Sequence, residues 1–458
     1  MNNLTSTIAA ISTPPGKGGV ALIRISGDEA VAIAEKCFIP KNAKPLSSQQ
    51  ARRAIYGDVI FEGEKIDDAI ATVFRAPASY TGEDTVEIAC HGGVLISRTV
   101  LEAVFAAGAM PATAGEFTRR AFVGGKISLS DAEAIGMLLE AKTHSQILLN
   151  SSNSRDKLAK KTDAIHASLL LLLSTMYAKI DYPDEDLSDM TSSELCEALG
   201  EQEAELSSLI ATYKTGRAIN EGIETVICGK PNVGKSTLYN TLSGGDYAIV
   251  SEYEGTTRDV LQRTVSLGQV TLNLFDTAGI RETDAPVEKI GISLSREKIA
   301  EAELIFAVFD GSRPLDEYDL ELIETLKGAS ATVIAIVNKS DLEKKADDEI
   351  IRKVFSRVIY MTAKQGADEL KTAVEELFSD GKLSVGEDAI VSSARQYASL
   401  VRAKECIENA RKALFEGYPF DIASSDIEAC VGALAELDGR AVSEDIVSGI
   451  FSHFCVGK

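Results

Sequence analysis

The 458-residue sequence has little positive charge: 47 Lys and Arg residues stand against 69 Asp and Glu residues, a formal net charge of −22. Nucleic-acid binding needs clustered cations, so this balance argues against a free-standing nucleic-acid-binding protein. Any contact with RNA must be local or shared with a basic partner. The seven cysteines form no CxxC pair and no zinc spacing, which is typical of free thiols in a reducing compartment.

Long apolar runs are also missing. The most apolar stretch, Leu169 to Leu173, is far shorter than the roughly 20 residues that span a bilayer. The N-terminus has no basic region followed by an apolar core, so no secretory signal is predicted. We therefore expect a soluble cytoplasmic protein without a membrane segment, and its length predicts roughly three domains.

One stretch, Gly229 to Ser236, fits the phosphate-binding pattern G-x-x-x-x-G-K-[ST]. A short apolar strand precedes it and the opening turns of a helix follow it, which is the context that the motif requires. Backbone N–H groups of such a loop point at a polyphosphate, Lys235 reaches the terminal oxygens, and the Ser236 hydroxyl binds Mg²⁺. The nucleotide contacts expected from this stretch are Asn232, Val233, Gly234, Lys235, Ser236 and Thr237.

Four further motifs lie where ligands bind in a parallel α/β sheet, after the strands or in the loop after the first helix. The Asp341 carboxylate of N-K-x-D can accept two hydrogen bonds from guanine, which predicts GTP rather than ATP. A threonine, Thr257, is expected at Mg²⁺, and Asp276 supports the shell of that ion. The motif residues expected at the nucleotide are Thr257, Asp276, Thr277, Ala278, Gly279, Asn338, Lys339, Asp341, Thr362, Ala363 and Lys364.

The position after D-x-x-G carries mechanistic information. Ras-like switches have a Gln there that orients the attacking water, whereas this sequence has Ile280. An aliphatic side chain cannot orient water, so another polar residue must do so, and another cation must replace the missing arginine finger. Glu282, Asp284 and Glu288 are the downstream candidates, and sequence chemistry alone does not choose among them.

The rest of the chain predicts three further pieces. Residues 1–120 have the pattern of an α+β domain, while 121–218 and 380–458 are helical and flank an α/β segment at 219–379. The simplest arrangement is a Ras-like parallel-sheet G domain inserted into a helical bundle, which is tolerated where the ends of an insert lie close together. The strands predicted for the G domain are 224–228, 271–275, 304–309, 332–337 and 358–361.

These motifs, together with His91-Gly92-Gly93 and the terminal Phe454-Cys455-Val456-Gly457-Lys458, resemble the MnmE (TrmE) family of tRNA-modification GTPases over essentially the entire chain. The resemblance implies a potassium-activated GTPase whose G domains dimerise across their nucleotides, with K⁺ where an arginine finger would sit. It selects Glu288 as the water-positioning residue. The K⁺ ligands that it implies are Asn232, Ser251, Tyr253 and Thr256.

For the N-terminal domain the resemblance implies a constitutive homodimer that binds 5-formyl- or 5,10-methylene-tetrahydrofolate. Carried over by position, Arg24, Glu87, Lys126 and Lys458 are folate contacts and Cys455 is the functional cysteine, with its chemical role left open. From the residues alone, Arg24 either extends its charge to solvent at a strand edge or reaches an anion.

The family works with an MnmG (GidA)-type partner that uses FAD and NADH, in a heterotetramer or larger complex. It adds an aminomethyl-derived group to C5 of the wobble uridine of certain tRNAs. Two departures from the common pattern are the carboxylates Glu252 and Glu254 in the potassium loop and Thr362 in place of Ser.

Two alternatives remain open. A regulatory or ribosome-assembly GTPase switch would have no part in tRNA chemistry. A conventional GTPase awaiting an external activating protein would hydrolyse GTP equally in sodium and potassium.

Overall fold

The computed structural model describes residues 6–181, 191–243, 262–275, 299–363, 367–379, 383–440 and 442–458. The chain divides into two compact units, Met1–Gly136 with Ala435–Lys458, and Met137–Leu434. In the described ranges, no helix combines the length and the apolar composition needed to cross a bilayer.

The first unit is built on a sheet with the strand order β3-β4-β5-β6-β2-β1-β7. Neighbouring strands are antiparallel, except that β1 and β7 are parallel. The strands are β1 (Ile8–Ile11), β2 (Val20–Ser26), β3 (Phe38–Pro40), β4 (Ala54–Phe61), β5 (Glu64–Phe74), β6 (Thr85–His91) and β7 (Met110–Pro111). The helices are α1 (Ala30–Cys37), α2 (Val94–Ala106), α3 (Glu116–Val123) and α15 (Glu444–Ser452), with a 3₁₀ turn at Leu46–Ser48.

The two faces of this sheet differ because side chains alternate along each strand. On one face, Ile23, Ile25 and their neighbours form a buried apolar core with α1 and α2. The other face carries the cross-strand pair Arg24 and Glu87 together with the exposed apolar residues Val20 and Ile70. The sheet therefore presents an apolar and charged surface on the side away from α1 and α2.

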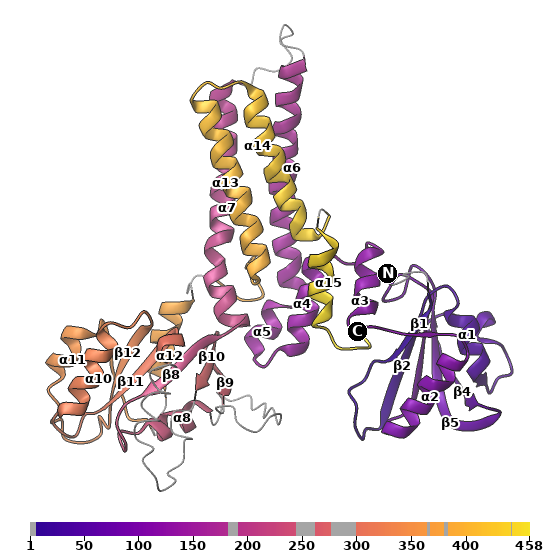
Figure 1. The fold of residues 1–458 in the computed structure, drawn as a ribbon, viewed down its shortest axis with the longest axis horizontal. Coiled ribbons are helices and arrows are strands. Elements are labelled where there is room, and N and C mark those ends of the chain that lie inside the picture. The colour runs from indigo at the N-terminus through magenta and orange to yellow at the C-terminus, as the bar shows by residue number, and fades with distance from the viewer. Residues whose placement is uncertain are drawn as a thin grey trace. The chain divides into compact units, whose positions relative to one another are not determined.

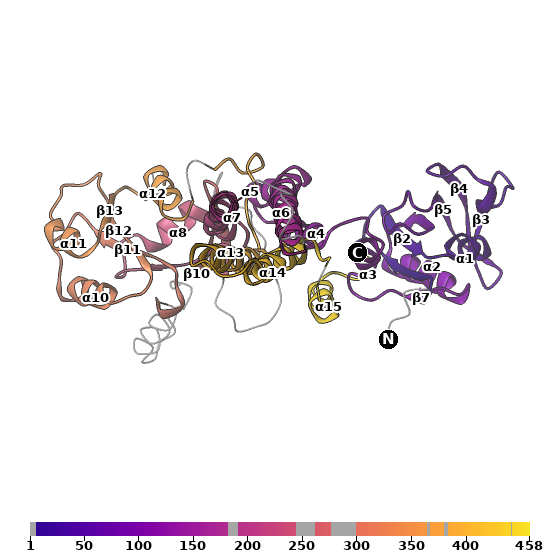
Figure 2. The same cartoon turned by 90° about the horizontal axis from the view of Figure 1, so that it is seen from above.

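The helices before and after the G domain pack as one bundle, as the sequence predicted. α6, α7, α13 and α14 run alongside one another (Figures 1 and 2), and the Tyr213 ring on α7 stacks on the Tyr397 ring of α13 at 4.4 Å. The helical character predicted for 121–218 is confirmed, and α6 buries one apolar side that includes Ile165, Leu169 and Met176. The helices are α4 (Leu129–Glu140), α5 (His144–Leu149), α6 (Ser152–Asp181), α7 (Ser192–Asn220), α13 (Ala394–Phe415) and α14 (Phe420–Asp438).

The G-domain sheet has the strand order β13-β12-β11-β8-β10-β9. Its strands are β8 (Ile223–Cys228), β9 (Gln262–Leu267), β10 (Val270–Phe275), β11 (Leu304–Asp310), β12 (Thr332–Asn338) and β13 (Arg357–Tyr360). The flanking helices are α8 (Lys235–Ser243), α10 (Glu317–Lys327), α11 (Asp348–Val354) and α12 (Asp368–Phe378).

The five strands predicted from the sequence are confirmed and pair in parallel. The antiparallel strand β9 was missed. Only alternate residues of β9, Val265 and Leu267, are buried, so it lacks the continuous apolar run that identified the other strands. It pairs with β10 through a turn at Gly268 and Gln269.

Candidate active site

The phosphate loop lies between β8 and α8, as expected, and α8 begins at Lys235. The Lys235 Nζ donates hydrogen bonds to the carbonyl oxygens of Gly229 at 2.8 Å and Lys230 at 2.6 Å. Burial lowers the pKa of this lysine because it disfavours the ammonium form. A polyphosphate beside Lys235 would supply the negative charge that restores this form.

Asn338 joins the phosphate loop to the loop after β13. Its Nδ2 donates to the Val233 carbonyl at 2.7 Å, and its Oδ1 accepts from the Ala363 N–H at 2.9 Å. Gly234 has φ +104°, and a Cβ atom there would overlap the Asn338 amide, so only glycine fits. One buried amide thus holds together three motifs, the phosphate loop 105 residues before Asn338 and the loop 25 residues after it included.

The base-recognition residues meet at the ends of β12 and β13. The Thr362 Oγ1 donates to the Asp341 Oδ1 at 3.1 Å and lies 3.1 Å from the Ser340 Oγ. The Asp341 carboxylate is exposed, as a group that accepts from a guanine ring must be. Because Thr362 uses its hydroxyl here, its replacement of the more usual Ser keeps the relevant contact.

A residue that the motifs did not single out, Asp310, orients the lysine of N-K-x-D. It ends β11 opposite Asn338 in register, and its Oδ2 accepts from the Lys339 Nζ at 2.6 Å. Although burial opposes the charge of Asp310, its hydrogen bonds to Lys339 and Ser312 lower its pKa. The sequence signal for this contact was a carboxylate, Asp310, at the end of the apolar strand that precedes the strand of N-K-x-D.

Several predicted residues lie outside the described residues. They include the proposed water-positioning residue, the loop residues expected at Mg²⁺ and K⁺, and the D-T-A-G run. The residues in this group are Ser251, Tyr253, Thr256, Thr257, Asp276, Thr277, Ala278, Gly279, Glu288 and Lys364. Of the phosphate-loop residues, Asn232 and Ser236 are exposed at the surface of the loop, and Asn232 has φ +64°.

In the first unit, Arg24 is held by a carboxylate and two aromatic rings. Its Nε and Nη2 both lie 2.9 Å from the Glu87 Oε1. Its guanidinium carbon lies 5.0 Å from the Tyr80 ring centroid and 5.5 Å from the Phe117 ring centroid. Arg24 is therefore fixed in place rather than extended freely into solvent.

Lys126 lies against the loop at residues 77–83, which also contains Tyr80. Its Nζ donates to the carbonyl oxygens of Pro77, at 3.0 Å, and Ser79. The Phe117 N–H donates to the Lys458 carbonyl at 3.1 Å, so the backbone of Lys458 contacts the residue whose ring lies against the Arg24 guanidinium. The four residues predicted as folate contacts thus gather around the loop at 77–83 and the start of α3.

The terminal Phe-Cys-Val-Gly-Lys segment belongs to the first unit and is held there through its own backbone groups. Val456 forms a bridge with Ala114, the Gly115 N–H donates to the Cys455 carbonyl at 3.4 Å, and the Ser12 Oγ donates to the Gly457 carbonyl at 2.9 Å. Cys455 itself is exposed. The segment is therefore held while its thiol stays open to solvent.

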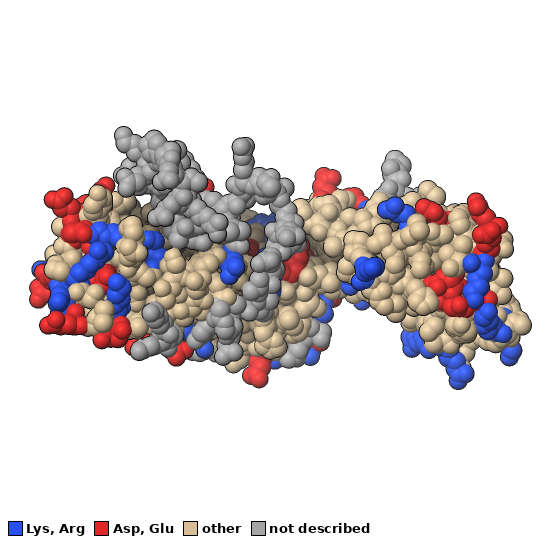
Figure 3. All heavy atoms as spheres, turned by 90° about the horizontal axis from the view of Figure 1, so that it is seen from below, with Lys and Arg blue, Asp and Glu red and all other residues tan. Residues whose placement is uncertain are grey.

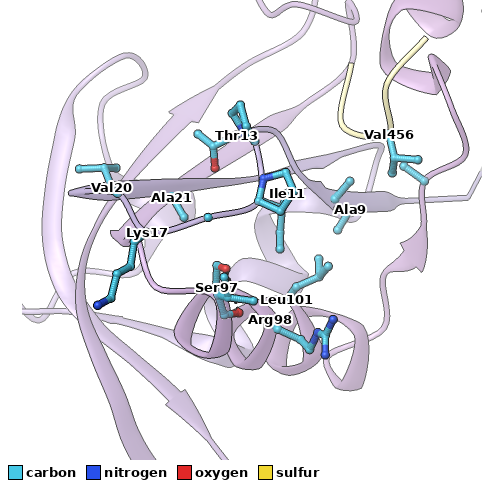
Figure 4. A pocket seen from close by; sticks show the side chains of 18 of the residues that line it. Ala9, Ile11, Thr13, Lys17, Val20, Ala21, Ser97, Arg98, Leu101 and Val456 are labelled. Atoms are coloured by element: carbon cyan, nitrogen blue, oxygen red, sulfur yellow. Dashed lines mark hydrogen bonds between the residues drawn. The ribbon is translucent and has the colours of Figure 1, made fainter. Parts of the chain in front are cut away.

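A pocket of about 730 Å³ lies beside this segment, between the turn at 13–18, α2 and Val456 (Figure 4). Ala9, Ala21 and Leu101 line its apolar part. None of Arg24, Glu87, Lys126 and Lys458 lines it. Ala9 and Ala21 belong to the sheet face that packs on α1 and α2, whereas Ala10 and Val20 belong to the face of Arg24, so residues of both faces line the pocket.

The fold and the site define a GTP hydrolase: a G domain with a guanine-recognition motif, inserted into a helical bundle and preceded by an α+β unit. Two family models match the chain, the "GTP-binding protein TrmE N-terminus" over residues 7–126 and the "MnmE helical domain" over residues 129–455.

Three relatives, each named "tRNA modification GTPase MnmE", match along almost the whole chain. The Bacillus licheniformis protein is 40% identical over 459 residues, covering 99% of this chain and 100% of that protein. The proteins of Clostridioides difficile and Bacillus subtilis are 37% and 38% identical, with the same coverage of 99% and 100%. The chain belongs to the MnmE (TrmE) family.

Proposed function

We propose that this protein is a potassium-activated GTPase that modifies C5 of the wobble uridine of certain tRNAs. It would use a tetrahydrofolate one-carbon unit and work with an FAD-dependent partner of the MnmG type. The observation that carries the proposal is the docking of the Cys455-containing segment beside the Arg24 site. A GTPase that acted only as an assembly switch would not need an exposed thiol on a segment held at the start of α3, where Phe117 contacts Arg24.

At the nucleotide, the residues of the chain have separate tasks. Lys235 and the loop N–H groups orient the phosphates, and Asp341 accepts hydrogen bonds from guanine. Ser236 and Thr257 would hold Mg²⁺, which offsets the charge of the phosphates. Asn232, Ser251, Tyr253 and Thr256 would hold K⁺. Glu288 would hold the attacking water in line.

The Arg24 site has the chemistry of a folate site. Arg24 and Lys126 offer cations to a glutamate tail, while the Tyr80 and Phe117 rings offer flat apolar surface. The one-carbon unit itself is supplied by the bound folate. The exposed apolar residues Val20 and Ile70 on the same sheet face support a homodimer formed through this unit.

The acidic balance of the chain supports a shared tRNA interface. On the face in Figure 3, Lys and Arg residues of the described G domain lie among Asp and Glu residues. A polyanion gains little from such intermixed charge, so the partner would supply much of the tRNA-binding charge.

The role of the terminal segment is tested by Cys455→Ser in a deletion strain, with wobble-uridine modification measured on isolated tRNA. We expect modification to be lost while GTP hydrolysis by the purified protein is retained. Cys406→Ser, at a half-buried cysteine of α13, is the matched control. Unchanged modification in the Cys455 variant would favour the regulatory switch instead.

Potassium activation is tested by steady-state GTP hydrolysis in Na⁺, K⁺ and Rb⁺. We expect the rate to rise in K⁺, and Asn232→Ala to remove that rise while Asn240→Ala on α8 keeps it. Equal rates in Na⁺ and K⁺ would favour a conventional GTPase that awaits an activating protein.

The water-positioning residue is tested by Glu288→Ala, which should abolish hydrolysis and keep nucleotide binding. An active variant would return the water-positioning role to Glu282 or Asp284.

The dimer is tested by light scattering of the full chain. Ile70→Glu should lower the measured mass towards that of one chain, because a charge on the apolar sheet face would have to be buried in the interface. Leu171→Glu, at an exposed leucine of α6, is the control. An unchanged mass for the Ile70 variant would place the dimer contact elsewhere.

A further inference from the structure

The phosphate loop contains a second lysine, Lys230, which points to a different place from Lys235. Its Nζ lies 3.0 Å from the Asp319 Oδ2 and also pairs with Asp316. The ammonium group lies 5.7 Å from the Tyr318 ring centroid. The side chain of Lys230 is 11% exposed, and its charge is paired with carboxylates at the start of α10.

The two carboxylates that hold Lys230 form the N-terminal cap of α10. The Asp316 side chain accepts from the Tyr318 N–H at 3.0 Å, and the Asp319 Oδ2 accepts from the Asp316 N–H at 3.2 Å. Asp319 has a side chain that is only 3% exposed. Its Oδ2 therefore closes the capping box and binds the loop lysine with the same atom.

The backbone of Lys230 is part of the nucleotide site. Its carbonyl oxygen accepts from the Lys235 Nζ at 2.6 Å, beside the Gly229 carbonyl at 2.8 Å. The position of this carbonyl depends on where the Lys230 residue is held. A chain of contacts therefore runs from buried Asp319 through Lys230 to the phosphate-binding ammonium group.

We propose that Asp319 is a positioning residue of the phosphate loop, which it sets through Lys230. The charge of Lys230 is matched by Asp316 and Asp319, so Lys230 anchors the loop and does not bind phosphate. Loss of the anchor lets the loop backbone shift relative to β11 and α10. A displacement of about 1 Å in a positioned group costs about 100-fold in rate, so a partial loss of about tenfold in nucleotide affinity is expected.

The test compares Asp319→Asn, Lys230→Met and the double variant by binding of a fluorescent GDP analogue and by steady-state kinetics. Asp319→Asn keeps the side-chain shape and removes the charge. We expect each single variant to weaken GDP binding about tenfold, and the double variant to lose no more than either, since both remove one contact. Lys230→Arg keeps the charge and should restore most of the affinity.

The matched control is Glu324→Gln, which removes the partner of Lys327 on the exposed side of the same helix. It should leave GDP binding unchanged. Thermal unfolding without nucleotide separates positioning from a purely structural role. A lowered unfolding temperature with GDP affinity within twofold of wild type would overturn the proposal, and so would additive losses in the double variant. If Asp319→Asn does not fold, Lys230→Met with wild-type affinity still overturns it.

Discussion

Asn338 provides the sharpest quantitative test of the nucleotide site, because its buried amide donates one hydrogen bond and accepts another. Its Nδ2 donates to the Val233 carbonyl, and its Oδ1 accepts from the Ala363 N–H. Asn338→Ala leaves both backbone groups unpaired, and both belong to buried residues. A buried unpaired group costs about 1–3 kcal/mol, so the variant should lose about 2–6 kcal/mol of G-domain stability. A whole domain has only about 5–15 kcal/mol.

The assay is thermal unfolding of the full chain with and without GDP. The transition that GDP raises belongs to the G domain, because a ligand that binds only the folded form stabilises it. At roughly 2–4 °C per kcal/mol for a domain of this size, Asn338→Ala should lower that transition by at least about 4 °C. A shift of less than about 2 °C would refute the reasoning, since the two contacts would then add almost nothing.

Asn338→Asp tests the hydrogen bond that the Asn338 Nδ2 donates to the Val233 carbonyl. The new carboxyl keeps an acceptor for the Ala363 N–H but places a second oxygen against the Val233 carbonyl. Burial and this oxygen should raise its pKa above the usual value of about 3.9, because both disfavour the anion. The protonated form can donate to Val233, so the stability gap from wild type should be smallest at or below about pH 4, near the unfolded pKa, and grow as pH rises from there to the raised pKa. Asn240→Asp on the exposed side of α8 is the control, and a gap independent of pH would contradict the argument.

Three further outcomes are expected. Asp341→Asn should move nucleotide preference from GTP to XTP in a competition assay, and a retained GTP preference would contradict the role given to Asp341. Gly457→Ala should lower tRNA modification and leave GTP hydrolysis unchanged, because φ is +100° and a Cβ atom there would overlap the Ile11 carbonyl; full modification would show that the terminal segment needs no such docking. The hydrogen bond that the His91 Nδ1–H donates to the Asp67 carboxylate raises the pKa of His91, so this pair should stabilise the fold below about pH 6.5 and lose its effect as pH rises through the raised pKa. Asp67→Asn should therefore destabilise the protein more at pH 6 than at pH 9 in thermal unfolding, and equal losses at both pH values would count against it.

Local patterns were enough to predict the class of each domain and five of the strands of the G domain. Buried parallel strands have continuous apolar runs, and helices show apolar residues at three- and four-residue steps, so β11 and the helical segment 121–218 were predicted from their sequences. The strand β9 was missed because only one of its faces is buried. Edge strands of this kind have a pattern close to that of a polar loop.

The contacts that organise the site were much harder to predict. Asn338 is the first letter of a recognised motif, yet its bonds to Val233 and Ala363 depend on how three loops meet in space. The docking of Gly457 on Ser12 joins residues 445 positions apart. Such pairings come from tertiary packing, and no local periodicity records them. The family resemblance predicted Arg24 and the other expected folate contacts. It did not predict that the Tyr80 and Phe117 rings fix the position of Arg24.

The two lysines of the phosphate loop show why residue type alone does not assign electrostatic roles. Lys230 and Lys235 lie in one eight-residue motif, but Lys230 faces two carboxylates of α10 and Lys235 faces the loop carbonyls. A matched ion pair exerts little attraction at a distance, and salt screens exposed charges beyond about 10 Å at 0.1 M. The binding of a triphosphate by a chain of net charge −22 therefore rests on short-range contacts with Lys235 and the loop N–H groups. An acidic protein can bind a polyanionic ligand because Lys235 and the N–H groups of the phosphate loop attract the phosphates at short range.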